Sequence, residues 1–89
     1  MLNIEYTNIF EKDLKKIAKQ GRDIDFLKSI IQIIANETAL DKKHQEHLLK
    51  GEYENCSECH IKPDWLLIYY IENETLVLLR TGSHSELFK

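Results

Sequence analysis

The fold is decided by one stretch, Trp65-Leu66-Leu67-Ile68-Tyr69-Tyr70-Ile71-Glu72-Asn73-Glu74-Thr75-Leu76-Val77-Leu78-Leu79-Arg80-Thr81. Its first seven residues are a near-continuous apolar run, which is typical of a strand in the middle of a sheet. The polar residues 72–74 predict a turn, and residues 75–81 predict a last strand that Gly82 ends. Because consecutive strands with a short connection pair antiparallel, the stretch predicts two neighbouring antiparallel strands.

The segments before this stretch extend the sheet. Residues 54–61 predict a strand with Cys56, Glu58 and His60 on one face and Ser57 and Cys59 on the other. The dipeptide at 63–64 interrupts the chain before the apolar run, so three consecutive strands form an antiparallel meander. Residues 2–6 alternate between apolar and polar side chains, which predicts an opening strand.

Two helices are predicted between the opening strand and the meander. Apolar side chains recur at helical spacing in both, namely Phe10, Leu14, Ile17 and Ala18, then Leu27, Ile30, Ile31 and Ile34. Asn8 with Glu11 predicts a capping box for the first helix, Gly21 its end, and Asp23 the cap of the second. The order strand, helix, helix and three strands predicts the α+β class, with both helices packed on one face of an antiparallel sheet.

Composition limits the size and class of the protein. Eighty-nine residues, of which 43% are hydrophobic and 30% charged, predict one globular domain over residues 1–89. No apolar run approaches the roughly 20 residues that cross a bilayer, and the N-terminus carries no export signal. We therefore expect a cytoplasmic protein with no membrane contact. The net charge of −3 does not support nucleic-acid binding, which must be argued from particular residues.

The pattern Cys56-Ser57-Glu58-Cys59-His60 has the spacing of a c-type haem attachment sequence. Haem is disfavoured because there is no export signal and the only methionine is Met1. A zinc site would need a second pair of ligands at finger spacing, and a redox motif normally opens a helix. We expect two reduced structural cysteines, no metal and no cofactor.

A second group of side chains is spread along the chain but gathers at one edge of the predicted sheet. In an antiparallel sheet the end of one strand lies beside the start of its neighbour. The ends of the strands at 54–61 and 75–81 therefore lie at the same edge as the start of the middle strand at 65–71. The group consists of His47, His60, Asp64, Trp65, Arg80, His84 and Phe88. Imidazoles serve as acid and base, a guanidinium binds phosphate, and an aromatic ring stacks on a base, so the set suits cleavage of a phosphodiester in RNA. Each residue also has a purely structural explanation.

Three blocks of sequence carry a resemblance to a known family. They are His47-Leu48-Leu49-Lys50-Gly51, Glu58-Cys59-His60-Ile61-Lys62-Pro63-Asp64-Trp65-Leu66-Leu67-Ile68-Tyr69 and Arg80-Thr81-Gly82-Ser83-His84-Ser85-Glu86-Leu87-Phe88. In this order they resemble the YafQ branch of the RelE/ParE toxin superfamily over essentially the whole chain. The resemblance implies a RelE-like fold and a bacterial type II toxin, an endoribonuclease (mRNA interferase) that cuts mRNA in the ribosomal A site. It also implies a cognate ribbon-helix-helix-type antitoxin, through which alone the toxin contacts operator DNA.

The resemblance implies a role for each site residue. Arg80 stabilises the pentavalent phosphorus, and His84 is the first candidate for the general acid. His60 or Asp64 serves as the base or orients it, and His47 binds phosphate or shares in proton transfer. Trp65 and Phe88 hold bases or shape the pocket.

Departures from the family pattern leave an alternative open. Ser57 stands where the family usually has Arg, Cys56 stands where an aromatic is common, and the chain is acidic. Since phosphate contacts dominate affinity for nucleic acids, the alternative is an attenuated toxin that acts mainly as an antitoxin-binding and operator-regulating module. Poisoning of gyrase, as in the ParE branch, would leave the histidines and Asp64-Trp65 without a purpose.

Overall fold

The computed structural model of this chain describes residues 1–88. Its elements follow one another as β1 (Asn3–Tyr6), α1 (Asn8–Lys19), α2 (Ile24–Ala35), the 3₁₀ turn η1 (Lys42–His44), β2 (His47–Leu48), the 3₁₀ turn η2 (Gly51–Tyr53), β3 (Ser57–Lys62), β4 (Trp65–Glu72), β5 (Thr75–Gly82) and α3 (His84–Leu87). The α+β class and the meander β3–β4–β5 are confirmed. The strand expected at 54–61 begins only at Ser57, because Glu54 and Asn55 continue the turn that starts in η2, and Asn55 has a left-handed φ of +70°.

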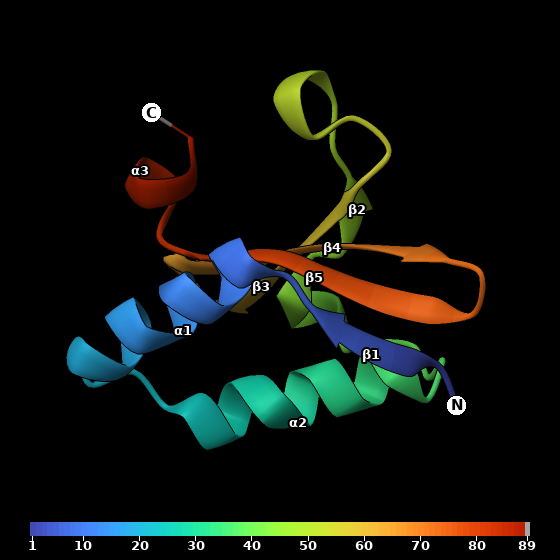
Figure 1. The fold of residues 1–89 in the computed structure, drawn as a ribbon, viewed down its shortest axis with the longest axis horizontal. Coiled ribbons are helices and arrows are strands. Elements are labelled where there is room, and N and C mark those ends of the chain that lie inside the picture. The colour runs from blue at the N-terminus through green and yellow to red at the C-terminus, as the bar shows by residue number, and fades with distance from the viewer. Residues whose placement is uncertain (89) are drawn as a thin grey trace.

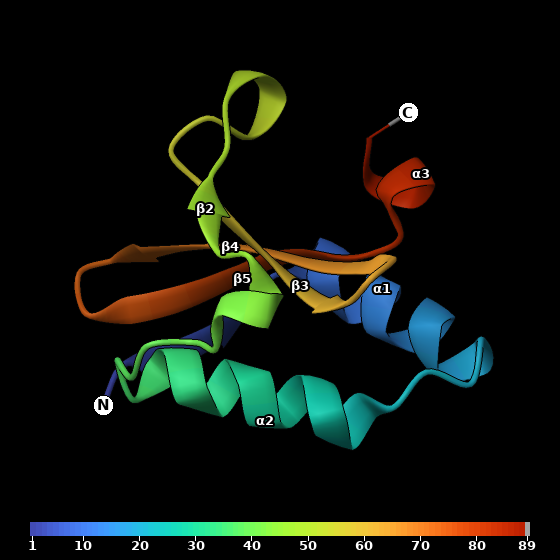
Figure 2. The same ribbon diagram turned by 180° about the vertical axis from the view of Figure 1, so that it is seen from behind.

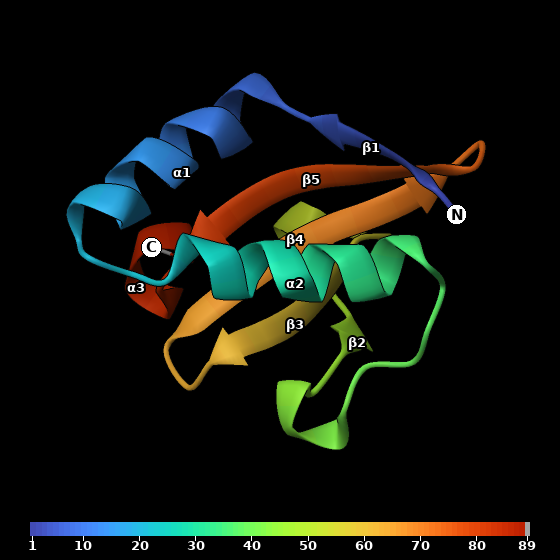
Figure 3. The same ribbon diagram turned by 90° about the horizontal axis from the view of Figure 1, so that it is seen from below.

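The five strands form one sheet in the order β1-β5-β4-β3-β2 (Figure 3). The strand pairs within the meander and the β2–β3 pair are antiparallel. β1 pairs parallel to β5, so the sheet is mixed rather than wholly antiparallel. A parallel neighbour is possible here because two helices, and not a tight turn, connect β1 to the meander.

The ends of the helices follow from local side chains. Thr7, and not Asn8, is the N-cap of α1, and its side chain accepts a hydrogen bond from the Phe10 backbone N–H. The capping box expected of Asn8 and Glu11 is therefore wrong, because the cap is one residue earlier and Phe10 takes the position that a glutamate would need. Gly21 follows α1 with a φ of +79°, the left-handed conformation that glycine adopts without strain. Asp23 caps α2 as expected.

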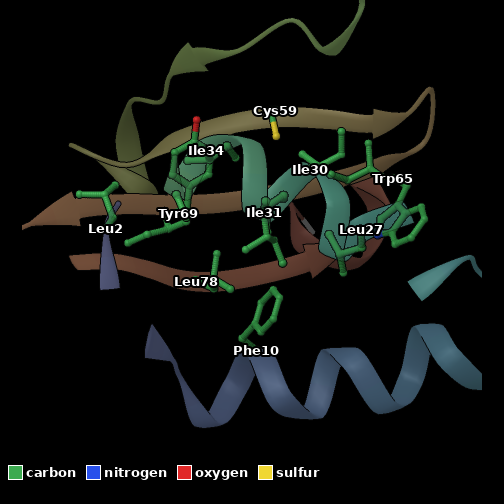
Figure 4. Close-up of a cluster of buried hydrophobic side chains, with 14 of the residues drawn as sticks. Leu2, Phe10, Leu27, Ile30, Ile31, Ile34, Cys59, Trp65, Tyr69 and Leu78 are labelled. Carbon is green, nitrogen blue, oxygen red and sulfur yellow. The ribbon is translucent and has the colours of Figure 1, made fainter. Parts of the chain in front are cut away.

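The two long helices cover one face of the sheet and leave the other to α3 and η2 (Figures 1 and 2). The covered face holds the main core, in which Phe10 of α1 and Leu27 and Ile31 of α2 meet Trp65 and Leu78 of the strands (Figure 4). A smaller apolar cluster on the other face contains Cys56, Leu66, Ile68 and Leu87. No helix among residues 1–88 is long and apolar enough to cross a membrane.

The C-terminal segment holds a short helix that the sequence patterns did not predict. Ser83 caps α3, and its hydroxyl and backbone exchange hydrogen bonds with the backbone and side chain of Glu86. The same carboxylate meets Lys16 Nζ at 2.9 Å and accepts from Gln20 Nε2 at 3.0 Å, which ties α3 to α1. These contacts fix where His84 stands.

Candidate active site

The face of the sheet opposite the long helices carries the chemistry. Glu58 and His60 alternate with buried Cys59 along β3, so their side chains point to this face, where Ile68 and Leu66 of β4 are their partners. Cys56 and Cys59 lie in the two different apolar clusters, as the alternation predicted, and both thiols are free.

A bulge in β5 turns Arg80 toward this face. Ile68 is opposite Arg80, but the next residue, Tyr69, is opposite Leu78, so Leu79 is an extra residue in the strand. Strict alternation from the core residue Leu78 would place residue 80 among the helices. The bulge reverses that alternation and re-aims the guanidinium, a device that recurs beside functional sites.

Glu58 joins two of the predicted histidines. Its carboxylate is 3.0 Å from His47 Nε2 and 4.0 Å from His60 Nε2, although the residue is only 5% exposed. His47 also places Nδ1 2.8 Å from the carbonyl oxygen of Gln45, which can only accept. Both ring nitrogens of His47 therefore contact oxygen atoms, one of Gln45 and one of Glu58, at the rim of the site.

His84 faces His60 across the site. The two ring centroids are 5.6 Å apart in an edge-to-face arrangement. Asp64 accepts hydrogen bonds from both the backbone N–H and Nδ1 of His84, each at 3.3 Å. These bonds lower the pKa of Asp64 and keep its carboxylate ionised. Because Nδ1 donates to that carboxylate, Nε2 of His84 is the nitrogen left for chemistry.

Arg80 is held from two sides. Its Nε donates to Asp13 Oδ2 at 2.7 Å and its Nη2 to Asp13 Oδ1 at 3.2 Å, while Nη1 lies 3.4 Å from the hydroxyl of Tyr53. The bonds to Asp13 raise the pKa of Arg80, so the guanidinium stays charged. β1 ends opposite Leu78, and α1 then brings Asp13 beside the uncovered end of β5.

Tyr53 connects Arg80 to the other site residues. Its ring contacts Phe88 edge-on at 5.6 Å between centroids, and Phe88 lies 6.4 Å from the ring of His84. The contacts thus run without a break from Arg80 through Tyr53 and Phe88 to His84. Phe88 is 39% exposed, which leaves much of its ring free to meet a ligand.

Trp65 is the predicted site residue that the structure places elsewhere. It is 1% exposed, its ring belongs to the main core, and its Nε1 donates to Thr81 Oγ1 at 2.8 Å. A nucleobase has no access to this ring. Trp65 therefore shapes the site from below by fixing Thr81, the neighbour of Arg80.

Three residues of the site were missed by sequence reasoning. Asp13 lies on the apolar stripe of the first helix, between Phe10 and Ile17. A charged residue on a buried stripe indicates a buried partner for its carboxylate. The strand alternation predicts Glu58 on the His60 face, but nothing in the sequence assigns it a role. Tyr53 lies in η2, where no periodic pattern marks it.

The structure also changes the meaning of Ser57. In β3 it alternates with Glu58 and therefore shares the face of Cys59 and of its partner Tyr69. An arginine in place of Ser57 would start on the helix side of the sheet. The idea that Ser57 removes a cation from the site is therefore wrong.

Among residues 1–88, no three side chains of His, Cys, Asp or Glu are grouped as a metal ion would need. Cys59 is fully buried, and burial, with the carboxylates of Glu46 and Glu58 nearby, raises the pKa of its thiol to about 12. A protonated thiol is a poor metal ligand.

Comparison with known proteins identifies the family. Residues 2–89 match the family described as bacterial toxin of type II toxin-antitoxin system, YafQ. The chain belongs to the YafQ toxin family. A curated YafQ relative, the mRNA interferase toxin YafQ of Escherichia coli K12, is 34% identical over 87 residues, which cover 97% of this chain and 95% of the relative.

Solved YafQ-like structures agree with this fold. A metal-bound toxin from Helicobacter pylori is 47% identical with a TM-score of 0.93, and the match covers 99% of this chain and 100% of that one. YafQ in the Escherichia coli DinJ–YafQ complex is 33% identical with a TM-score of 0.89, and the match covers 100% of both chains. The fold of this chain is therefore the fold of YafQ, which agrees with the prediction from the sequence.

Proposed function

We propose that this chain is an endoribonuclease, an mRNA interferase, and the toxin of a toxin–antitoxin pair. The observation that carries the proposal is the facing pair His60 and His84, each beside a carboxylate, with Arg80 linked to the same cluster. Family membership supports it, since the Escherichia coli relative bears the name mRNA interferase toxin.

Cleavage begins with loss of the proton of a ribose 2′-hydroxyl. We assign this proton to Nε2 of His60, whose neighbour Glu58 stabilises the imidazolium that forms. Asp64 is a weaker base than an ordinary carboxylate because its pKa is lowered. The freed 2′-oxygen attacks phosphorus, and the bond from phosphorus to the 5′-oxygen breaks.

His84 supplies the proton for the leaving 5′-oxygen. Asp64 orients the ring through Nδ1, which aims Nε2 away from the carboxylate. The products are a 2′,3′-cyclic phosphate and a free 5′-hydroxyl, so atoms and charges balance with one proton taken up and one delivered. Histidine suits both steps because it exchanges protons near neutral pH.

Negative charge grows on phosphorus during the attack. Asp13 and Tyr53 hold Arg80 in place before substrate arrives, and its remaining N–H donors face the non-bridging oxygens. A preorganised donor of this kind stabilises charge as it develops and spends no energy on reorganisation. His47 stands at the rim as a further group for phosphate or proton transfer, and Phe88 offers its exposed ring to a base.

Partners follow from the relatives. The complex of YafQ with DinJ supports a cognate antitoxin for this chain. We extend the proposal to mRNA on the ribosomal A site, to an antitoxin of the ribbon-helix-helix type, and to operator contact only through that antitoxin. The net charge of −3 makes the ribosome a useful anchor, because the chain by itself has little general attraction for RNA.

The test is cleavage of a translated mRNA in a reconstituted translation system. We expect the wild type to cut within the reading frame and His84→Ala to be slower by about 10²–10⁴-fold, the usual contribution of a general acid. Ser85→Ala is the matched control, since Ser85 is the next, exposed residue of α3. Omitting the ribosomes tests whether cleavage depends on them.

The outcomes separate the two functions considered. Equal cleavage by the wild type and His84→Ala would contradict the catalytic assignment. If neither protein cuts but both bind the antitoxin and its operator, the chain is an attenuated toxin that acts as a regulatory module.

A further inference from the structure

A cavity of about 420 Å³ lies beside the catalytic cluster and has no role in the mechanism above. It opens between the first turn of α2, η1 and the end of β3. The residues that matter for its chemistry are Phe26, Lys43, His44, His60 and Lys62. Its volume falls in the range of small-ligand sites.

The cavity has a built aromatic wall. The carbonyl oxygen of His60 can only accept, so His44 Nδ1 donates to it, at 2.6 Å, and this bond fixes the buried ring of His44. Phe26 lies 6.3 Å from that ring, and Lys62 Nζ stands 4.4 Å from the Phe26 centroid. A flat ligand therefore finds two rings and a cation within one small space.

The charge of the wall is opposite to that of the whole chain. Lys43 and Lys62 line the cavity, and none of its lining residues is a carboxylate, whereas the protein carries a net charge of −3. Two cations in a lining that holds no carboxylate favour an anionic ligand. A planar and anionic ligand of this size is a nucleotide, whose base stacks and whose phosphate meets ammonium groups.

The cavity and the catalytic cluster share one residue, His60. That residue faces His84 on one side and belongs to the cavity wall on the other. β2 pairs with β3 only at Ser57 and Glu58, and beside His60 the edge of β3 is occupied by η1, whose His44 bonds the His60 carbonyl oxygen. An RNA strand that leaves the scissile phosphate would therefore pass over η1 to reach the cavity.

We propose that this cavity is a subsite for a nucleotide of single-stranded RNA next to the scissile phosphate. The base lies against the half-buried ring of Phe26, which the buried His44 supports from behind, and the flanking phosphate meets Lys43 and Lys62. The inference rests on the proposed nuclease function and gives its substrate a second point of attachment.

The test is an NMR titration of the ¹⁵N-labelled chain with a 2′-O-methyl hexa-adenylate, which stacks well and cannot be cleaved because it lacks a 2′-hydroxyl. We expect shift changes at two places, the catalytic His60 and His84 and the cavity residues Phe26 and Lys43. Lys43→Ala with Lys62→Ala should weaken binding about tenfold. It should also reduce the salt slope by about 0.7, the value for one phosphate contact on a single strand.

Two further variants sharpen the test. Lys12→Ala with Lys15→Ala removes the same charge from the exposed side of α1 and should bind within about twofold of the wild type. Phe26→Leu keeps an apolar side chain at the core boundary and should weaken binding about tenfold while the salt slope stays unchanged. Melting curves of all variants check that each is folded.

The results distinguish failure of the subsite from failure of the nuclease proposal. Shifts confined to the catalytic residues, or equal affinities of the cavity pair and the α1 control pair, would overturn the subsite and leave the nuclease standing. Shifts in neither place would overturn the subsite, and the cleavage assay with ribosomes decides the nuclease proposal separately. Loss of antitoxin affinity in the cavity pair, with RNA affinity unchanged, would assign the cavity to the protein partner instead.

Discussion

Asp13→Ala removes one carboxylate that three donors share. Its oxygens accept from Arg80 Nε at 2.7 Å, from Arg80 Nη2 at 3.2 Å and from the backbone N–H of Thr81 at 3.1 Å. Thr81 is buried, so its amide is left without a partner away from water. Arg80 keeps a quarter of its side chain exposed, so water replaces part of what the guanidinium loses.

The size of the effect follows from these environments. An orphaned buried amide costs about 1–3 kcal/mol, and the exposed part of the ion pair adds about 1 kcal/mol. We expect the free energy of unfolding to fall by about 2–4 kcal/mol. For a domain of this size that lowers the melting temperature by about 10–25 °C.

The assay is urea denaturation of the wild type, Asp13→Ala, Arg80→Ala and the double variant. Asp13 and Arg80 touch, so the double variant should lose less stability than the sum of the single ones, with a coupling energy of about 1–2 kcal/mol. Asp13→Asn is the matched control, because its amide oxygen still accepts from Thr81 and should recover part of the loss. Additive effects within about 0.5 kcal/mol would refute the view that the carboxylate holds Arg80.

Three further predictions concern other parts of the molecule. Arg80→Ala should slow mRNA cleavage about 10²–10³-fold, and Arg80→Lys should keep part of the lost cleavage rate, when each variant is assayed well below its melting temperature. Full activity of Arg80→Ala would remove Arg80 from the mechanism. Hydrogen bonds from the Ser83 backbone and from Lys16 lower the pKa of Glu86 from 4.5 to about 2. The Glu86 carboxylate should therefore hold α3 fully above pH 4.5 and less firmly as the pH falls toward 2. The measurement is amide exchange in α3, which should become faster over this range of pH. In Glu86→Gln the exchange should be fast at every pH. Burial raises the pKa of Cys59 to about 12, so iodoacetamide at pH 8 should modify this thiol only after unfolding, and rapid modification of the folded chain would contradict its burial.

The local patterns of the sequence were enough for the elements and their order. Helical spacing located α1 and α2, and the apolar run with its polar turn located β4 and β5. The turn itself follows from Asn73 and Glu74, which adopt φ values of +50° and +59°, a conformation asparagine tolerates well. These features depend on residues a few positions apart, which is why they are visible in the chain alone.

The gathering of the site was also partly predictable. Antiparallel strands bring the end of β3 beside the start of β4, and this places His60 near Asp64. His84 joined them because it follows β5 closely. The roles of these histidines in catalysis, in contrast, stay predictions for the cleavage assay.

What the sequence by itself determined is therefore the α+β order, the strand pairs of the meander and the neighbourhood of the histidines. The tertiary structure alone decided that β1 runs parallel to β5, that Trp65 faces the core, and that Arg80 meets Asp13 across 67 positions of sequence. The physical reason is that a side chain's face depends on register, and one extra residue, Leu79, moves Arg80 to the other side of the sheet. Register is settled by the packing of distant segments against each other, and no local pattern records it.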